Sequence, residues 1–374
     1  MRTKARFFHI NPSISYVLHR VLILFASTIL ASIIIFTILR ILPGDTATII
    51  AGKDASVGQV ERLREKMGLN APLIEQYFEW IKGFFTGSLG NSAVDNTSIS
   101  ASIWQKSLVT FPLCILSLLF SLIIALPIGI MAGMRTNKQK VDDKNRGIKI
   151  NNFNIANFFD FILQGASAIP ALWAGLLILL LLGKGVGVLP ILPSQGFPLG
   201  GFGVSPQEAF VSLLLPALSV AIIVSSRIMR VTKTEIQKVQ DADFIRFAMS
   251  TGKTRLNAML KIGLRASGTA IFSTIALTFA EMLTGVVVVE KLFALPGLSS
   301  MLLHDIGVRD LIKVQSELLL LVLFILILGI VIDVISSIID PRIGRRETKY
   351  YAQWAVGGFR RSRGSRNVRE RGSA

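Results

Sequence analysis

The chain has 374 residues with a mean hydropathy of +0.59; 51% of the residues are hydrophobic and the net charge is +17. This composition excludes an ordinary soluble globular protein and indicates a membrane protein. The single cysteine, Cys114, excludes an intrachain disulfide and a cysteine metal site. The three histidines, His9, His19 and His304, are isolated from one another, so we predict no metal site within the chain.

Six apolar runs are long enough to cross about 30 Å of hydrocarbon as helices. They cover residues 21–39, 107–134, 161–183, 209–226, 266–289 and 318–339. Because an open sheet cannot satisfy its backbone groups in lipid, we predict an all-α, polytopic membrane protein with six transmembrane helices. The first run is long for a signal peptide and no small-residue cleavage pattern follows it, so we expect a retained span.

The charges are distributed unevenly between the two sides that these spans define. One side, made of residues 1–20, 135–160, 227–265 and 340–374, carries 29 basic and 9 acidic residues. The loops on the other side carry 10 basic and 12 acidic residues. The positive-inside rule predicts that both termini are cytoplasmic and that residues 43–106 form a long external loop between spans one and two. Because topology explains the basic character, no nucleic-acid partner is predicted.

The external loop has the pattern of two helices. In ASVGQVERLREKMG, apolar residues recur at helical spacing and Gly68 is the predicted C-cap. The next segment, NAPLIEQYFEWIKGFF, has an apolar face after Pro72. That face consists of Leu73, Ile74, Tyr77, Phe78, Ile81, Phe84 and Phe85. It lies either on the membrane or against the spans, and the mixed charge of the opposite side favours packing against the spans.

Three regions follow from these patterns. Residues 1–106 contain the first span and the external helices, and residues 107–345 form a transmembrane core with a cytoplasmic loop at 227–265. Within the core, the glycine- and proline-rich residues 183–205 are predicted to be an external turn. The arginine-rich residues 346–374 have no periodicity, and we predict a disordered cytoplasmic tail attracted to anionic membrane lipid.

The segment FAMSTGKT, residues 247–254, ends like a phosphate-binding P-loop. Gly252, Lys253 and Thr254 fit the pattern GxxxxGK[ST], but Phe247 occupies the position of the first glycine. A P-loop also follows a buried strand, whereas the charged residues before this segment contain no apolar run. We therefore predict that the segment does not bind ATP.

The same loop is predicted to contain a short helix. Asp241 or Asp243 can cap its start, Gly252 can end it, and Thr254 can begin a second helix leading into span five. The apolar residues on one side of this helix are Phe244, Ile245, Phe247, Ala248 and Met249. This patch either docks into a groove on another protein or folds back on the chain's own helices, and the pattern leaves both open.

Several segments in a fixed order carry a resemblance to a known family. DADFIRFAMSTG, EKLFALPGL, RDLIKVQ and IIDPRIG resemble the inner-membrane permease subunits of binding-protein-dependent ABC importers, in the dipeptide and oligopeptide branch. RILPGD, MGLNAPLIEQYFEWIKGFFTGSLGNS and LPIGIMAG, earlier in the chain, resemble the same branch. The resemblance covers residues 20–344.

In that family the short helix of the fourth loop is a coupling helix that inserts into a separate ATPase subunit. The resemblance implies an ATPase-coupling site made of Phe244, Arg246, Phe247, Ala248, Met249 and Gly252. Arg246, Ala248 and Gly252 fall at positions of the family's EAA-type motif, with Arg246 in place of the first glutamate.

The resemblance also implies a re-entrant outer element after span five, near the place where a binding protein delivers substrate. Its residues are Glu290, Phe293, Pro296 and Gly297, and the alternative is a tight structural turn built on Pro-Gly. Glu281 and Asp333 lie inside spans five and six, where an acid is costly and therefore a functional candidate. From its position, and not from the family, Glu281 is a candidate for the translocation path; either acid could instead line a wet cavity or bond a neighbouring helix.

The function implied by the resemblance is that of a non-catalytic permease subunit in a bacterial inner membrane. The implied partners are a homologous second permease, two ATP-binding subunits and an extracytoplasmic substrate-binding protein; ATP and magnesium belong to the ATP-binding subunits, and the chain needs no cofactor. The implied substrates are dipeptides or oligopeptides. One alternative is the same architecture for nickel or another small solute. The other is a proton-coupled secondary transporter that uses Glu281 and Asp333, although no repeat of its two halves is visible.

Overall fold

The computed structural model describes residues 12–41, 46–51, 55–66, 68–92, 94–145, 165 and 169–339. Within these residues the regular elements are helices, and extended backbone pairs only at two isolated bridges, Asn91 with Ser98 and Gly183 with Leu192. The all-α prediction is confirmed. The predicted tail at 346–374 and the first residues of the predicted span 161–183 lie outside the described residues.

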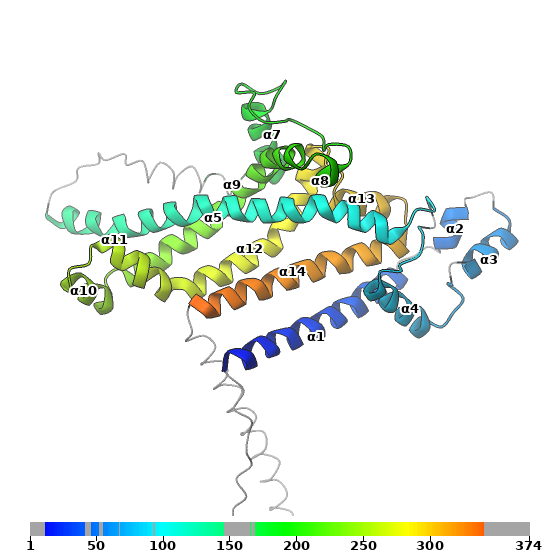
Figure 1. The fold of residues 1–374 in the computed structure, drawn as a ribbon, viewed down its shortest axis with the longest axis horizontal. Coiled ribbons are helices and arrows are strands. Elements are labelled where there is room, and N and C mark those ends of the chain that lie inside the picture. Colours follow the sequence, from blue (N-terminus) through cyan, green and yellow to red (C-terminus); the bar gives the residue numbers. More distant parts are fainter. Residues whose placement is uncertain are drawn as a thin grey trace, which may run out of the picture.

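Five described helices are long and apolar enough to cross a membrane, and Figure 1 shows them running side by side. They are α1 (Pro12–Ile41), α5 (Ile99–Asn145), α9 (Pro206–Val239), α14 (Leu311–Ile339) and a continuous helix of α11 (Arg255–Ala258), a π-helical turn (Met259–Gly263) and α12 (Leu264–Leu292). The shorter apolar helix α7 (Ala171–Leu182) packs on α9 and α12 and corresponds to the end of the third predicted span. The chain is thus a polytopic membrane protein.

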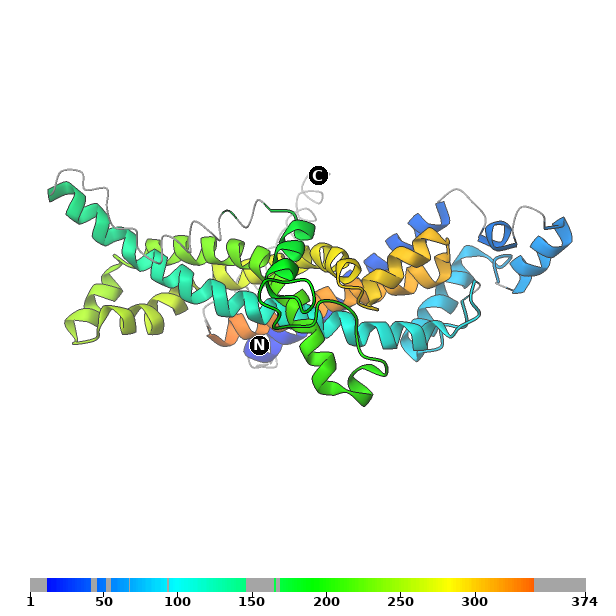
Figure 2. The same ribbon diagram turned by 90° about the horizontal axis from the view of Figure 1, so that it is seen from above.

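Several shorter helices lie at the two ends of this bundle. At one end is α10 (Asp243–Ser250), beside α11; at the opposite end are α2 (Thr46–Ala51), α3 (Val57–Lys66) and α4 (Leu73–Thr86) (Figures 1 and 2). The single turn α8 (Gly201–Val204) precedes α9, and α13 (Leu298–Gly307) joins α12 to α14. The two loops that the charge pattern assigns to opposite sides of the membrane are therefore at opposite ends of the long helices.

α5 and α9 approach each other closely through two glycines. A Cβ atom on Gly133 would lie 2.7 Å from Cγ2 of Ile236, and one on Gly129 would lie 2.8 Å from Cβ of Thr232. Small residues four apart on a membrane helix allow this close approach of two backbones. The segment LPIGIMAG therefore has a packing role at the contact between α5 and α9.

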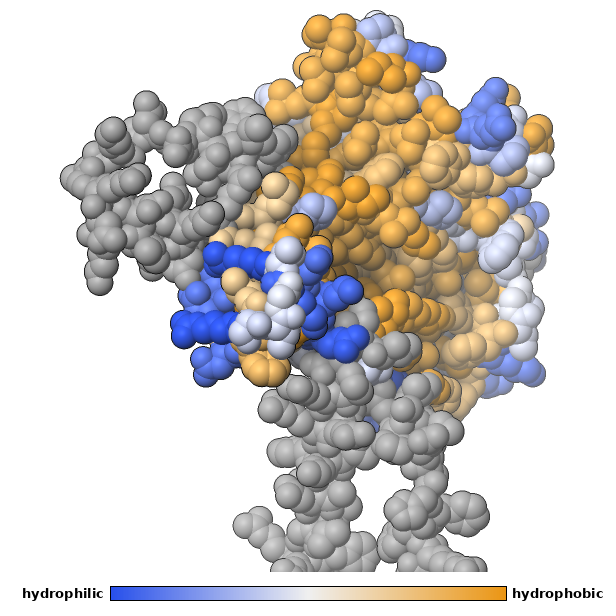
Figure 3. Space-filling view, turned by 60° about the vertical axis from the view of Figure 1, so that its left-hand side comes forward, coloured by the Kyte–Doolittle hydropathy of each residue, from blue (hydrophilic) through white to orange (hydrophobic). Residues whose placement is uncertain are grey.

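The outer surface of the helices is hydrophobic. α1 and α14 expose large apolar side chains such as Phe25, Leu30 and Ile327, which a soluble protein would bury. Figure 3 shows a broad hydrophobic face over the long helices and hydrophilic residues gathered at the end that comes forward, where α10 and α11 lie. This distribution suits helices surrounded by lipid with one end in water.

The helix α4, predicted to be external, packs against the bundle with part of its predicted face. Trp80 is buried and its Nε1 donates a hydrogen bond of 3.0 Å to Oγ of Ser316, and Tyr77 contacts Phe36 edge-on with ring centroids 5.5 Å apart. Other members of that face are exposed: Leu73, Ile74, Phe78 and Phe85. The predicted face was centred wrongly, because Trp80, which the prediction left out, takes the central packing position.

Candidate functional site

The helix α10 begins without a side-chain cap. Ala242 is the N-cap residue, with an extended backbone, and no side-chain hydrogen bond caps the helix start. The prediction that Asp241 or Asp243 caps α10 is therefore wrong. Asp243 is the first helical residue, where its carboxylate can instead interact favourably with the positive end of the helix dipole.

The end of α10 is a Schellman turn centred on Gly252. The N–H of Lys253 donates to the carbonyl of Ala248 at 3.3 Å, and the N–H of Gly252 donates to the carbonyl of Met249 at 3.0 Å. Gly252 has a φ of 88°, in the left-handed region that favours glycine. Thr254 is the N-cap of α11 and accepts from the N–H of Asn257 at 3.4 Å. The predicted roles of Gly252 and Thr254 are confirmed.

One side of α10 is buried in the chain itself. Ile245 is 0% exposed and Ala248 is 4% exposed, and both belong to an apolar cluster with Ile130 of α5, Ile236 of α9 and Met259. For this half of the predicted patch, folding back on the chain's own helices is the correct alternative. Ala248 was predicted to be part of the coupling site. It is instead buried and packs α10 against the chain's own helices.

The other side of α10 is open. Phe247 is 71% exposed, Phe244 and Met249 are each 43% exposed, and Arg246 is also exposed. We call these four residues the outer face of α10. An exposed group of two phenylalanines and a methionine at the hydrophilic end of the bundle is apolar surface that a partner protein can cover (Figure 3).

Two polar contacts fix the helices on either side of α10. Nη2 of Arg255 donates to Oε1 of Gln240 at 3.1 Å, which joins the end of α9 to the start of α11. Oγ of Ser267 in α12 donates to the carbonyl of Glu235 in α9 at 3.3 Å. The helix α10 is thus seated on α11 and the π-helical turn, and its apolar cluster also includes Ile130 of α5 and Ile236 of α9.

At the opposite end of the bundle, Glu290 of α12 is a fully buried acid with a full set of partners. Its Oε1 accepts from Oγ1 of Thr110 at 2.5 Å, and its Oε2 accepts from the N–H of Ser300 at 2.8 Å. Oγ1 of Thr110 in turn accepts from the N–H of Leu298 at 2.7 Å. Leu298 and Ser300 lie in the first turn of α13, where backbone N–H groups have no partner within the helix. Thr110 and Glu290 accept hydrogen bonds from these two N–H groups, and the carboxylate interacts favourably with the positive end of the helix dipole.

The other predicted outer-mouth residues form a packed turn around this acid. Phe293 is buried, and its carbonyl accepts from the N–H of Gly196 at 2.9 Å. Gly297 lies so close to the Glu290 carboxylate that a Cβ atom has no room there. Pro296 alone is exposed. This geometry corresponds to the structural turn that was left as the alternative.

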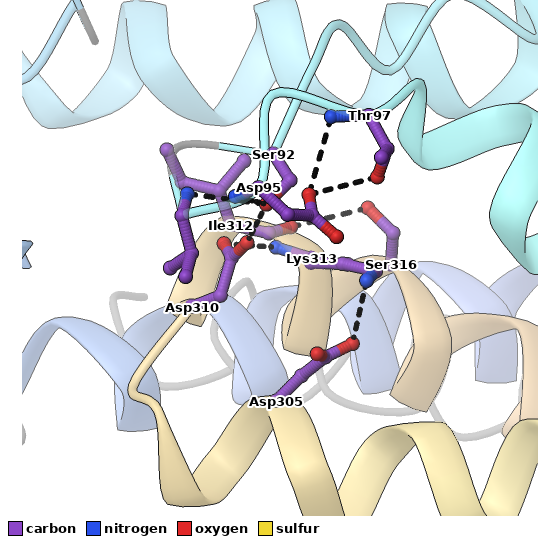
Figure 4. Close-up of polar contacts among 9 residues, drawn as sticks. Ser92, Asp95, Thr97, Asp305, Asp310, Ile312, Lys313 and Ser316 are labelled. Carbon is purple, nitrogen blue, oxygen red and sulfur yellow. Dashed lines mark hydrogen bonds and ion pairs between the residues drawn. The ribbon is translucent and has the colours of Figure 1, made fainter.

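A second polar cluster near this end was not found from the sequence (Figure 4). Nζ of Lys313 lies 3.0 Å from Oδ2 of Asp305, and both residues are buried. Oδ2 of Asp310 accepts from Oγ of Ser92 at 2.6 Å, and its Oδ1 accepts from the N–H of Lys313 at 3.3 Å. The position of Asp310 just before α14 could have identified it as a helix cap. Its partner Ser92 is 218 residues away and could not be found by spacing.

Asp95 belongs to the same loop as Ser92. Its Oδ1 accepts from the N–H and the hydroxyl of Thr97 at 3.2 and 2.8 Å. The neighbouring hydroxyl of Ser92, together with the hydrogen bonds from Thr97, lowers the pKa of Asp95 from 3.8 to about 2. The bonds from Thr97 hold the carboxylate against the loop before α5.

The two acids predicted inside the spans are both ion-paired. Glu281 of α12 pairs with Arg227 of α9, and Oδ2 of Asp333 lies 3.4 Å from Nη1 of Arg20. The Arg227–Glu281 pair borders a pocket of about 290 Å³ between α7, α9 and α12, whose lining includes Thr278. Among the described residues, no group of three or more His, Cys, Asp or Glu side chains is placed to hold a metal ion.

Comparison with known proteins identifies relatives along nearly the whole chain. Residues 125–345 match a family model described as binding-protein-dependent transport system inner membrane component, and residues 13–113 match the model of its N-terminal part. A putative peptide transport system permease protein of Brucella abortus (strain 2308) is 30% identical over 315 residues, 84% of this chain and 94% of the relative. The glutathione transport system permease protein GsiC of Escherichia coli O6:H1 is 27% identical over 330 residues, 88% of this chain and 99% of the relative.

Proposed function

Because this chain belongs to the binding-protein-dependent transport system inner membrane components, as an ABC importer permease of the peptide family, we propose that it forms half of a pathway that imports small peptides. In this proposal it is a multi-pass subunit of a bacterial inner membrane. It works with ATP-binding subunits and a substrate-binding protein, as permeases of ABC importers do in general.

The observation that carries the mechanism is the division of α10 into two faces. Ile245 and Ala248 are buried against the long helices, whereas Phe247 is 71% exposed at the end of the bundle. We propose that an ATP-binding subunit holds the outer face of α10 in a groove, and that the buried face passes its movement to α5, α9 and α12. Closure of the two ATP-binding subunits would then switch the pathway between outward-open and inward-open states.

The proposed topology places α10 in the cytoplasm and α2, α3 and α4 outside. The charge distribution supports it, and so does the position of these elements at opposite ends of the bundle (Figure 1). Six spans in one chain are few for a closed pathway, so the second half of the pathway is proposed to be a homologous permease. The tail at 346–374 is proposed to remain on the cytoplasmic side near anionic lipid.

A peptide substrate is supported by the names of the relatives, one for peptide and one for glutathione transport. Nickel or another small solute is the remaining alternative within the same architecture. The proton-coupled alternative has lost support, because Glu281 and Asp333 are each held by an arginine and neither acid stands alone in its span.

The experiment is transport by the complete importer in proteoliposomes. The chain is purified with its second permease and ATP-binding subunits, and ATP is enclosed on the side of α10. Radiolabelled tripeptide or nickel is then supplied with the binding protein on the other side. ATP-dependent accumulation of peptide is the expected result. Accumulation of nickel alone would replace the proposed substrate, and accumulation driven by a pH gradient without ATP would contradict the proposed mechanism.

A further inference from the structure

The ion pair between Arg227 and Glu281 is partly exposed rather than buried in the chain. The side chains of Arg227 and Glu281 remain 46% and 49% exposed, although Glu281 lies within the apolar run of residues 266–289 and Arg227 directly follows the apolar run of residues 209–226. Exposure of these two charges to hydrocarbon would be costly. This face of α9 and α12 must therefore meet water or protein in the membrane rather than lipid.

The space beside the pair has the character of a small-molecule site. The pocket of about 290 Å³ is near the lower limit of ligand sites in proteins, which begin at about 300 Å³. Its walls combine apolar side chains, such as Val224 and Met282, with the hydroxyl residues Thr278 and Thr284.

The charges of the pair match those of an unmodified peptide. A guanidinium binds a carboxylate with two parallel hydrogen bonds, and a carboxylate binds an ammonium group. A zwitterionic peptide can therefore separate the pair and leave neither charge unpaired, because each side chain exchanges one partner of opposite charge for another. A peptide with one blocked terminus would leave one of the two side chains without a partner, which is costly away from water.

We propose that Arg227 and Glu281 form a peptide-terminus site on the translocation path, with Arg227 binding the α-carboxylate and Glu281 the α-ammonium group. This inference rests on the proposed peptide-import function and deepens it. It makes the pathway itself selective for free termini, in addition to any selection by a binding protein. Asp333 does not line this pocket and pairs instead with Arg20 at the contact between α14 and α1.

The test is equilibrium binding of trialanine, N-acetyl-trialanine and trialanine amide to the permease–ATPase assembly in nanodiscs, without the binding protein. In the wild type, each blocked peptide should bind about 10-fold or more weakly than trialanine, because it loses one charge-assisted hydrogen-bonded contact. In Glu281→Gln the effect of acetylation should disappear, and in Arg227→Gln the effect of amidation should disappear. Such coupling between a ligand change and a side-chain change isolates the contact itself.

Either single variant leaves one charge unpaired and could disturb folding. The double variant Arg227→Gln/Glu281→Gln has no unpaired charge, and it should bind trialanine at least 10-fold more weakly than the wild type and without preference among the three peptides. Asp333→Asn is the matched control and should keep the wild-type preferences. Absence of trialanine binding in the wild type, or a preference for free termini that survives in the double variant, would overturn the inference. Uptake of trialanine by the wild-type importer in proteoliposomes tests the proposed function separately.

Discussion

The carboxylate of Glu290 accepts a 2.5 Å hydrogen bond from the hydroxyl of Thr110, a residue 180 positions earlier in the chain. This contact joins α5, α12 and the first turn of α13, because the same hydroxyl accepts from the N–H of Leu298. We predict that Thr110→Val lowers the free energy of unfolding by about 1–3 kcal/mol, since it leaves Oε1 of Glu290 and the N–H of Leu298 without a partner.

Thermal unfolding of the purified chain in detergent checks this prediction. The control is Thr274→Val, because the hydroxyl of Thr274 bonds only to the carbonyl of Ala270 in its own helix. Equal melting temperatures for the two variants would show that the buried network around Glu290 adds nothing to stability.

Gly133 tests the close contact of α5 with α9. Gly133→Val adds a branched side chain where a Cβ atom alone would lie 2.7 Å from Ile236, so the helices must separate. Overpacking of this kind costs about 1–3 kcal/mol. We expect a lower melting temperature and weaker recovery of the ATP-binding subunits, since Ile236 also supports Ile245 of α10. Gly329→Val in α14 is the matched control, because a Cβ atom there meets nothing within 4 Å; a similar loss in both variants would refute the packing argument.

Gly252 tests the end of α10. A Cβ atom on Gly252 would meet nothing within 4 Å, so the cost of a substitution comes only from its left-handed backbone. Valine in that conformation costs about 1 kcal/mol or more, whereas asparagine adopts it more readily. We expect Gly252→Val to impair peptide uptake and Gly252→Asn to retain most of it in the reconstituted importer. Full uptake by the valine variant would mean that the Schellman turn is dispensable.

The loop before α5 gives a pH dependence. The pKa of Asp95 is lowered by its hydrogen bonds, so its stabilising effect is complete above the ordinary value of 3.8 and is lost as the pH falls toward about 2. Asp95→Asn should therefore lower the melting temperature at pH 6, and its difference from the wild type should shrink as the pH falls below 3.8. Glu79→Gln, exposed on α4, serves as the control. A difference that stays constant with pH would exclude this role of Asp95.

The sequence predicted those features that local patterns encode. The apolar runs located the long helices, and Gly68 and Gly252 have the left-handed backbone expected of residues that end a helix. It could not decide which side of α10 faces inward, because Phe247 and Ile245 are both apolar and lie on different sides of a short helix. The positions of Ile130, Ile236 and Met259 in the fold settle that choice.

The polar contacts at the other end of the bundle could not be predicted from the sequence for a different reason. The family resemblance implied that Glu290 is an outer-mouth residue, but its hydrogen bonds depend on Thr110 and Ser300, which the fold brings to it. The buried ion pair of Lys313 with Asp305 likewise depends on how α13 folds back against α14. In both cases charged residues near the end of a span hold helices together through partners that the fold brings to them.

The central claim, that the outer face of α10 is the contact with the ATP-binding subunit, is tested most directly by comparing Phe247→Asp with Ala248→Asp in copurification of that subunit. Phe247 is 71% exposed, so Phe247→Asp should leave membrane insertion and melting temperature unchanged while abolishing recovery of the ATP-binding subunit and peptide uptake. Ala248→Asp should instead destabilise the chain itself, because it buries an unpaired charge among Ile130, Ile236 and Met259. Val57→Asp, on exposed α3 at the opposite end, is the control. Normal recovery of the ATP-binding subunit with Phe247→Asp would contradict the account.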